Sequence, residues 1–224
     1  MSNTNNLRRV LAIEVANENQ IKKVINFMET KYFPKDAENR GLSESVLRVL
    51  DMKNKSIVYF QKVHSELFDA NQVDIIKDAL HGVNLKIIEA IGEIQEIILK
   101  GLEFKDEKLR WVSIFDFDNG AEEFCNILEK EYLPEMYSLN YFSSKVRKIL
   151  DEKQSTVKAI YIVEPKDALT IDRHEIHQHR SEKLKSFSDY LENKIKNGEI
   201  HMIDAKGKLQ EINLKTRFSP RSQS

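Results

Sequence analysis

The chain has 224 residues, and its 35 Lys and Arg against 36 Asp and Glu give a formal net charge of -1. Such a balance excludes a global field that would recruit polyanions, so any nucleic-acid contact would need a local basic patch. The single Cys125 excludes an internal disulfide and a cysteine-rich zinc site. The polar start and the absence of a long apolar run predict a soluble, cytoplasmic protein with no membrane partner.

A stretch of the first half, residues 26–53, recurs in the second half at a fixed offset. Shifting the sequence by 100 positions places Tyr32 on Tyr132 and Pro34 on Pro134. The same shift matches further identical residues at Asn26, Glu29, Ser43, Val46, Leu50, Asp51 and Lys53. This match predicts an internal duplication, with a first repeat over 1–104, a second over 105–214 and a disordered tail over 215–224.

The first half begins with a predicted strand over 7–15, where apolar residues alternate with smaller or charged ones. Asn17 or Asn19 then offers a cap to a helix over 20–33, which Pro34 is expected to end. A second helix is predicted to begin at Ser43, followed by a β-branched and aromatic strand over 57–60. One continuous helix over 43–68 is the alternative.

The longest regular element is predicted as a helix over 71–99. Its apolar residues recur at alternating spacings of three and four, from Val73 to Ile97, as in a heptad seam. A second apolar flank makes this face wider than a two-stranded seam, which favours a core helix. The other interpretation is a helix through which the chain binds a protein partner or forms a homodimer.

The second half is predicted to repeat this pattern. A hairpin over 102–104 and 109–117 leads to helices over 121–133 and 137–151, a strand over 157–163 and a helix over 172–196. A closing hairpin is expected from strands over 200–204 and 209–214. The sequence therefore predicts an α+β fold with internally duplicated β-α-α-β-α-β halves, in which a mixed sheet has helices packed on it.

The two halves differ most at the start of their last helices. Val73 and Leu80 of the first half correspond to Arg173 and Arg180, and His177 lies on the same helical stripe. Unpaired N–H groups at a helix start favour anions, and basic side chains there are unfavourable unless an anion is bound. The sequence therefore predicts an anion site at Arg173, His177, His179 and Arg180, for a phosphate or RNA ligand. A plain charged helix start explains the same residues.

Arg173 and His179 also resemble the R-x4-6-H motif of the HEPN family of metal-independent ribonucleases. The resemblance covers only these residues and implies a helical bundle that dimerises, with Arg173 binding the scissile phosphate and His179 in acid-base chemistry. His174 stands where that family has a small polar residue, and the predicted strands do not suit a bundle.

Other catalytic signals are weak. His174 and His177 miss the spacing of a His-Glu-x-x-His zinc motif, and no glycine-rich phosphate loop occurs. Cys125 lies in an amphipathic pattern and is expected in the core. We therefore expect no metal and no cofactor, and a non-enzymatic interaction or anion-binding protein, with the HEPN-like ribonuclease as the enzymatic alternative.

Overall fold

The computed structural model describes residues 7–40, 45–63, 72–99, 108–138, 142–143, 145–152, 157–167 and 181–214. Within these ranges, eight strands form one closed barrel in the order β1-β3-β2-β8-β5-β7-β6-β4, and every pairing is antiparallel. The strands are β1 (Leu7–Val15), β2 (Ser45–Asp51), β3 (Ser56–Lys62), β4 (Leu85–Ile98), β5 (Leu109–Phe117), β6 (Lys145–Asp151), β7 (Val157–Val163) and β8 (Ile200–Asn213).

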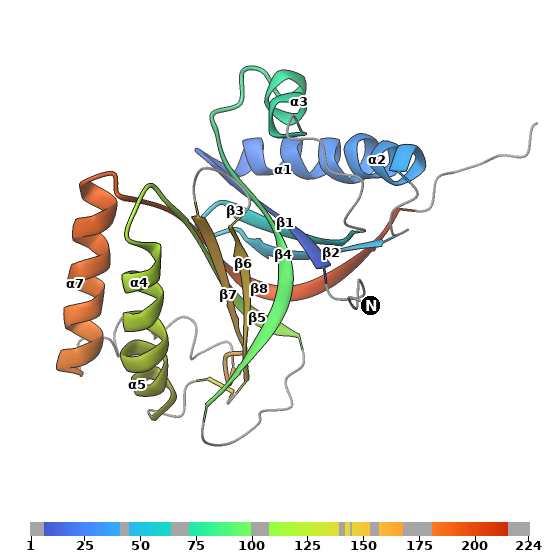
Figure 1. The fold of residues 1–224 in the computed structure, drawn as a ribbon. Helices are drawn as coiled ribbons and strands as arrows, with labels where there is room; N and C mark the ends of the chain where they lie inside the picture. Colours follow the sequence, from blue (N-terminus) through green and yellow to red (C-terminus); the bar gives the residue numbers. More distant parts are fainter. Residues whose placement is uncertain are drawn as a thin grey trace, which may run out of the picture.

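Helices cover the outside of the barrel in two places. Figure 1 shows α1, α2 and α3 together above the barrel, and α4, α5 and α7 together to its left. Their bounds, with the π-helical segments η2 and η3, are α1 (Glu18–Phe27), η2 (Met28–Tyr32), α2 (Phe33–Arg40), α3 (Gln72–Ala79), α4 (Ala121–Ile127), η3 (Leu128–Tyr132), α5 (Leu133–Ser138) and α7 (Glu182–Lys196). Asn17 caps α1 as predicted, because its side-chain oxygen accepts a hydrogen bond from the backbone N–H of Gln20.

The alternation of side chains along the strands divides the apolar residues into an inner core and two outer cores. On β5, Val112 and Ile114 face the barrel interior, whereas Trp111 and Phe115 pack toward the helices. Apart from Phe60, the interior is filled by β-branched and small side chains from both halves of the chain: Val10, Ala12, Val49, Val58, Ile88, Ala90, Val112, Ile114, Ile149, Ile160, Ile162, Ile203 and Ala205. Neither half encloses this core by itself.

Two long strands join the halves. β4 pairs first with β1 and then with β6, and β8 pairs first with β5 and then with β2. Each has a glycine where it changes partner, because a Cβ at Gly92 would collide with the carbonyl oxygen of Leu150 and one at Gly207 with that of Leu50. These close approaches allow the sheet to close on itself.

The predicted α+β fold with duplicated halves and a mixed sheet is wrong. The same succession of elements occurs in residues 7–98 and 109–213, but the two segments do not form separate sheets with helices on them. Their strands pair across the halves, β2 with β8 and β4 with β6, and the closed barrel results. The boundary expected between residues 104 and 105 lies outside the described residues, so the division into two domains stays a prediction.

The predicted helix over 71–99 is also wrong. The chain forms the short helix α3, turns at Gly82 with φ 82°, and continues as the 14-residue strand β4. Apolar residues lie on both faces of β4, because Ile88 and Ala90 face the barrel interior whereas Ile87 packs on the outer core of the first half. Apolar residues on both faces of a strand also give spacings of three and four. The many isoleucines favour the strand, because β-branched side chains suit a pleated surface.

Four other element predictions need correction. The segments expected as helices around 46–50 and 145–151 are the strands β2 and β6, and the closing hairpin is the single strand β8. Pro34 does not end its helix, because the π-helical segment before it shifts the backbone bonding so that Phe33 N–H bonds to Met28 O. The strands predicted over 7–15, 109–117 and 157–163 are confirmed.

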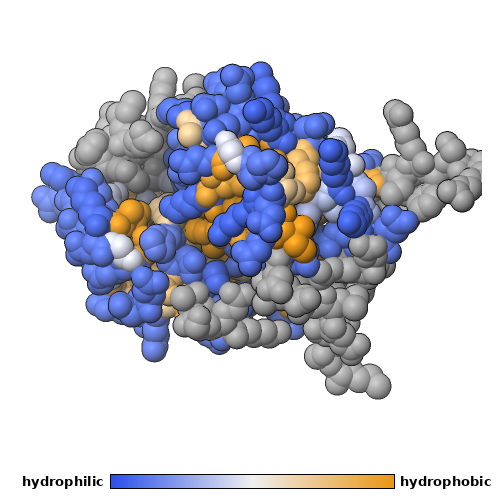
Figure 2. All heavy atoms as spheres, turned by 90° about the horizontal axis from the view of Figure 1, so that it is seen from above, coloured by the Kyte–Doolittle hydropathy of each residue, from blue (hydrophilic) through white to orange (hydrophobic). Residues whose placement is uncertain are grey.

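Two further features bear on the predictions that the chain has no membrane partner and that it binds a protein partner or forms a homodimer. Among the described residues, no helix combines the length and apolar character that a membrane span needs. Figure 2 shows hydrophobic side chains in the middle of the face seen from above, within a largely hydrophilic surface. The partner or homodimer expected through residues 71–99 stays a prediction, now for a segment that is mostly strand.

Candidate functional site

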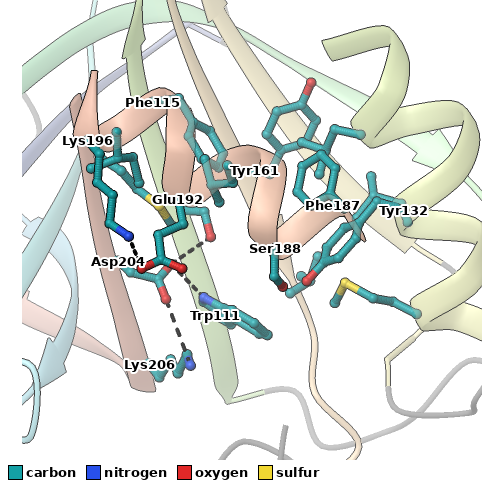
Figure 3. Close-up of a pocket in the computed structure, with 18 residues that line it drawn as sticks. Trp111, Phe115, Tyr132, Tyr161, Phe187, Ser188, Glu192, Lys196, Asp204 and Lys206 are labelled. Carbon is teal, nitrogen blue, oxygen red and sulfur yellow. Dashed lines mark hydrogen bonds and ion pairs between the residues drawn. The ribbon is translucent and has the colours of Figure 1, made fainter. Parts of the chain in front are cut away.

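A cavity of about 530 Å³ lies between the barrel and the helices of the second half. Its barrel side is the outer face of β5, β7 and β8, and its helical side is formed by η3, α5 and α7. Figure 3 shows the side chains that point into it from these elements. Five aromatic rings dominate the walls: Trp111, Phe115, Tyr132, Tyr161 and Phe187. A lining of this kind suits a flat, largely apolar molecule.

The barrel side follows from the register of two neighbouring strands. Trp111 of β5 lies opposite Lys206 of β8, and Ser113 lies opposite Asp204. Because residues two apart on a strand share a face, these four side chains all point outward to the helices. The register thus places one carboxylate and one ammonium group beside a tryptophan.

Asp204 is held by two hydrogen bonds to the same oxygen. Trp111 Nε1 and Ser113 Oγ each donate to Asp204 Oδ1, and both distances are 2.6 Å. Asp204 Oδ2 lies 3.9 Å from Lys206 Nζ, and the Asp204 side chain is 22 % exposed. Oδ1 is therefore occupied, and Oδ2 is the oxygen available to a bound molecule (Figure 3).

The surroundings of Asp204 raise the pKa of its carboxyl group. The largest cause is desolvation by the surrounding protein, and Asp51 adds a smaller effect in the same direction. Lys206 and the hydrogen bonds from Ser113 and Trp111 oppose it but do not cancel it. A raised carboxyl pKa in a cavity makes Asp204 a stronger base than an exposed aspartate, as proton-transfer chemistry requires.

Lys206 also contacts the face of Trp111, with Nζ 4.1 Å from the ring centroid. A cation over an indole face is attracted by the negative face of the ring. The Lys206 side chain is only 12 % exposed. Asp204 and Lys206 therefore present opposite charges on the barrel side of the cavity, and Glu192 and Lys196 of α7 add a second pair of opposite charges to its lining.

The helical wall is held by aromatic contacts. The rings of Tyr132 and Phe187 lie 4.2 Å apart between η3 and α7. Ser181 begins α7, since its hydroxyl accepts from Leu184 N–H, and the same hydroxyl donates to Glu135 of α5 over 2.7 Å. These contacts fix α7 against η3 and α5.

Tyr161 contributes its ring to the cavity, whereas its hydroxyl is engaged elsewhere. The hydroxyl donates to Glu129 Oε1 over 2.6 Å, and Lys148 Nζ donates to the same oxygen over 2.5 Å. Burial raises the pKa of Tyr161, and the neighbouring Cys125 and Glu129 add to this effect. Tyr161 is therefore a neutral wall of the cavity at ordinary pH.

The corresponding place on the other half of the barrel is filled by protein. There Leu11 of β1 lies opposite Glu89 of β4, and Arg9 reaches across to Glu89 Oε1 over 2.5 Å. Arg9 is 1 % exposed and also bonds to the hydroxyl of Tyr32 and to Asp36. A buried ion-pair network therefore fills the position on the first half that corresponds to the cavity around Trp111 on the second half.

The residues predicted as an anion site, Arg173, His177, His179 and Arg180, lie outside the described residues, and so does His174. Among the residues that the structure describes, no group of three His, Cys, Asp or Glu side chains could hold a metal ion. Cys125 is 8 % exposed and its pKa is raised by burial, as expected for a core residue.

Sequence reasoning missed the residues of the cavity. Asp204 and Lys206 were assigned to a strand end and a hairpin turn, which hid that they share one face of β8. The available signal was the polar Ser113 between Trp111 and Phe115, on the face of a strand that otherwise carries aromatic side chains.

Comparison with known proteins gives a likeness of fold. The chain is similar to an anthrone oxidase-like protein of known crystal structure, with a TM-score of 0.58 and 10 % identity, over 98 % of each chain. It matches a ferredoxin-fold protein related to antibiotic biosynthesis monooxygenases from Listeria monocytogenes with a TM-score of 0.39 and 12 % identity, over 90 % of this chain and 95 % of that one. A heme-degrading enzyme from Listeria monocytogenes gives a TM-score of 0.38 and 11 % identity, over 88 % of this chain and 98 % of that one.

The last two likenesses are too distant to carry an argument. No family model matches the sequence, and no curated protein matches it. The prediction of a non-enzymatic interaction or anion-binding protein is wrong, because the fold is shared with an oxidase-like protein and the cavity is aromatic rather than basic. The HEPN-like alternative is wrong as well, since that family implies a helical bundle and this chain forms a closed barrel.

Proposed function

We propose that this chain is an enzyme that binds a flat, largely apolar aromatic molecule in the cavity beside Trp111 and oxidises it with dioxygen. The observation that carries the proposal is Asp204, a carboxylate with a raised pKa on the barrel side of an aromatic cavity. The name of the structure with the same fold, an anthrone oxidase-like protein, supports the same class of chemistry. Anthrone is itself a flat tricyclic ketone with one activated methylene group.

The reaction consumes one dioxygen and releases one water. Asp204 Oδ2 takes a proton from the activated methylene group, and the resulting enolate passes its electrons to dioxygen as a carbon–oxygen bond forms. The hydroperoxide anion then takes the proton back from Asp204. Loss of water across the carbon–oxygen unit leaves a ketone, so the methylene group loses two hydrogens and gains one oxygen.

The surrounding residues position this base. The hydrogen bonds from Trp111 and Ser113 occupy Oδ1 and fix the plane of the carboxylate, which leaves Oδ2 for the substrate. The ammonium group of Lys206 lies close enough to Asp204 to stabilise an enolate oxygen formed beside it. No step runs through a metal or a cofactor, and the sequence-based expectation of none stays a prediction.

Anthrone binding and conversion test the proposal. Trp111 is the only tryptophan of the chain, so its fluorescence should report binding of anthrone in the cavity. For Asp204→Asn we expect binding to persist, because an amide oxygen can still accept from Trp111 and Ser113. The rate of oxidation should fall by about 10²- to 10⁴-fold, the usual contribution of a positioned base.

Asp189→Asn is the matched control, since it removes a carboxylate from the exposed face of α7. It should leave both binding and rate unchanged. In the wild type the rate should rise with pH through the raised pKa of Asp204, because only the ionised carboxylate accepts the proton. Equal rates of oxidation for the wild type and Asp204→Asn would show that Asp204 is not the base. Failure of anthrone and related polycyclic ketones to bind would contradict the proposed substrate class.

A further inference from the structure

Trp111 carries two charged neighbours that act on it in opposite directions. Its Nε1 donates to Asp204 Oδ1 over 2.6 Å, and Lys206 Nζ lies 4.1 Å from the centroid of its ring. The ring lines the cavity although it is 8 % exposed. Among the described residues it is therefore the indole in direct reach of any oxidant that enters the cavity.

These neighbours change the ease with which the indole loses an electron. Loss of an electron gives a cation radical, whose Nε1 proton becomes acidic. Asp204 favours this step because its carboxylate receives the proton. Lys206 opposes it because a second positive charge then lies over the ring, and the sheltered site weakens solvent screening between the two charges.

We infer that Lys206 protects Trp111 from oxidation, acting as a positioning residue whose charge keeps the ring in its reduced form beside the cavity. The inference rests on the proposed function only for the source of oxidants in the cavity. The charge argument itself depends on the geometry of Trp111, Asp204 and Lys206 alone.

A soluble one-electron oxidant tests this without any substrate. Hexachloroiridate(IV) takes one electron from the indole and is reduced to iridium(III), and the Nε1 proton passes to Asp204. A second equivalent of hexachloroiridate(IV) takes another electron from the neutral radical, water adds to the resulting cation with loss of a proton, and a mass increase of one oxygen appears on the peptide that carries Trp111. The rate of loss of tryptophan fluorescence measures the first step, because the chain has one Trp.

Lys206→Met should be oxidised at least about tenfold faster than the wild type, and Lys206→Arg should restore the wild-type rate. Asp204→Asn should be oxidised more slowly than the wild type, because an amide does not accept the proton. Lys194→Met is the control, since Lys194 lies over the ring of Tyr190 and not over Trp111. It also removes one positive charge, and it should leave the rate unchanged.

Lys206→Met and Asp204→Asn are expected to change the oxidation rate in opposite directions, which distinguishes the charge effect from damage to the fold. Loosened packing in the Lys206 and Asp204 variants would speed oxidation in both. A Lys206→Met rate equal to the wild type, or a Lys206→Arg rate as fast as that of Lys206→Met, would overturn the inference. Absence of anthrone oxidation by the wild type would leave these rates as they are, so the two proposals fail separately.

Discussion

Asp204, the base of the proposed reaction, carries a cost in stability. Its carboxyl pKa is raised above the ordinary value of 3.8, chiefly by desolvation. A raised folded-state pKa means that the contribution of this group to stability is fully present below the unfolded pKa and is lost as the pH rises through the folded one. Ionisation of Asp204 in the folded protein therefore lowers the free energy of unfolding.

Asp204→Asn should consequently be more stable than the wild type at pH 7, although it is the variant expected to lose activity. Its advantage should shrink as the pH falls toward 3.8, because the wild-type carboxyl group then gains a proton. Thermal unfolding of both proteins over this pH range measures the difference. A variant that is less stable at pH 7, with a gap that widens on acidification, would contradict the assignment of a raised pKa.

At the scale of residues, sequence reasoning identified a core residue correctly but did not identify the cavity residues Trp111 and Asp204. Cys125 was placed correctly in the core. The cavity depends on Trp111 and Asp204, which are 93 positions apart in the chain. Only the strand register brings them together, and a sequence without aligned relatives gives no access to that register.

At the scale of elements, the long strands β4 and β8 were the hardest to predict. Each is 14 residues long, more than twice the usual length of a strand. In each, the first part is more buried than the second. β4 therefore shows helix-like spacings, and β8 contains a Lys206-Gly207-Lys208 segment typical of a turn. The nine-residue strands β1 and β5 were predicted correctly, because each is rich in apolar residues and buried along nearly its whole length.

Gly207 is where β8 changes from β5 to β2, and its substitution tests how the barrel closes. A Cβ there would collide with the carbonyl oxygen of Leu50, a backbone atom that cannot turn away. Gly207→Ala should therefore cost about 1–3 kcal/mol of unfolding free energy, as other overpacked sites do. Denaturant unfolding measures this loss.

Gly82→Ala is the informative comparison. Gly82 has open space around its Cβ position but a φ of 82°, so the cost there is backbone strain of about 1 kcal/mol. Gly207→Ala should be the more damaging of the two. A Gly207→Ala protein as stable as the wild type would show that β8 and β2 do not approach as closely as the structure has them.

At the scale of the whole molecule, two different helical layers pack on the outside of one barrel. Both halves of the chain fill its interior, but only the helices of the second half enclose the cavity beside Trp111. In the first half the buried Arg9, paired with Glu89, occupies the matching place. The first half therefore completes the barrel that fixes the register of β5 and β8, and with it the position of Asp204.

The most direct test of this account is the fate of oxygen atoms during anthrone oxidation under ¹⁸O₂. Mass spectrometry of the product from the wild type should show one labelled oxygen in the new ketone, because the carbon–oxygen bond forms from dioxygen and the second atom leaves as water. Asp204→Asn, incubated under the same conditions with anthrone bound, should form far less of this product. A wild-type ketone without label, or equal labelled product from both proteins, would contradict the assignment of the cavity as a site of Asp204-assisted oxidation.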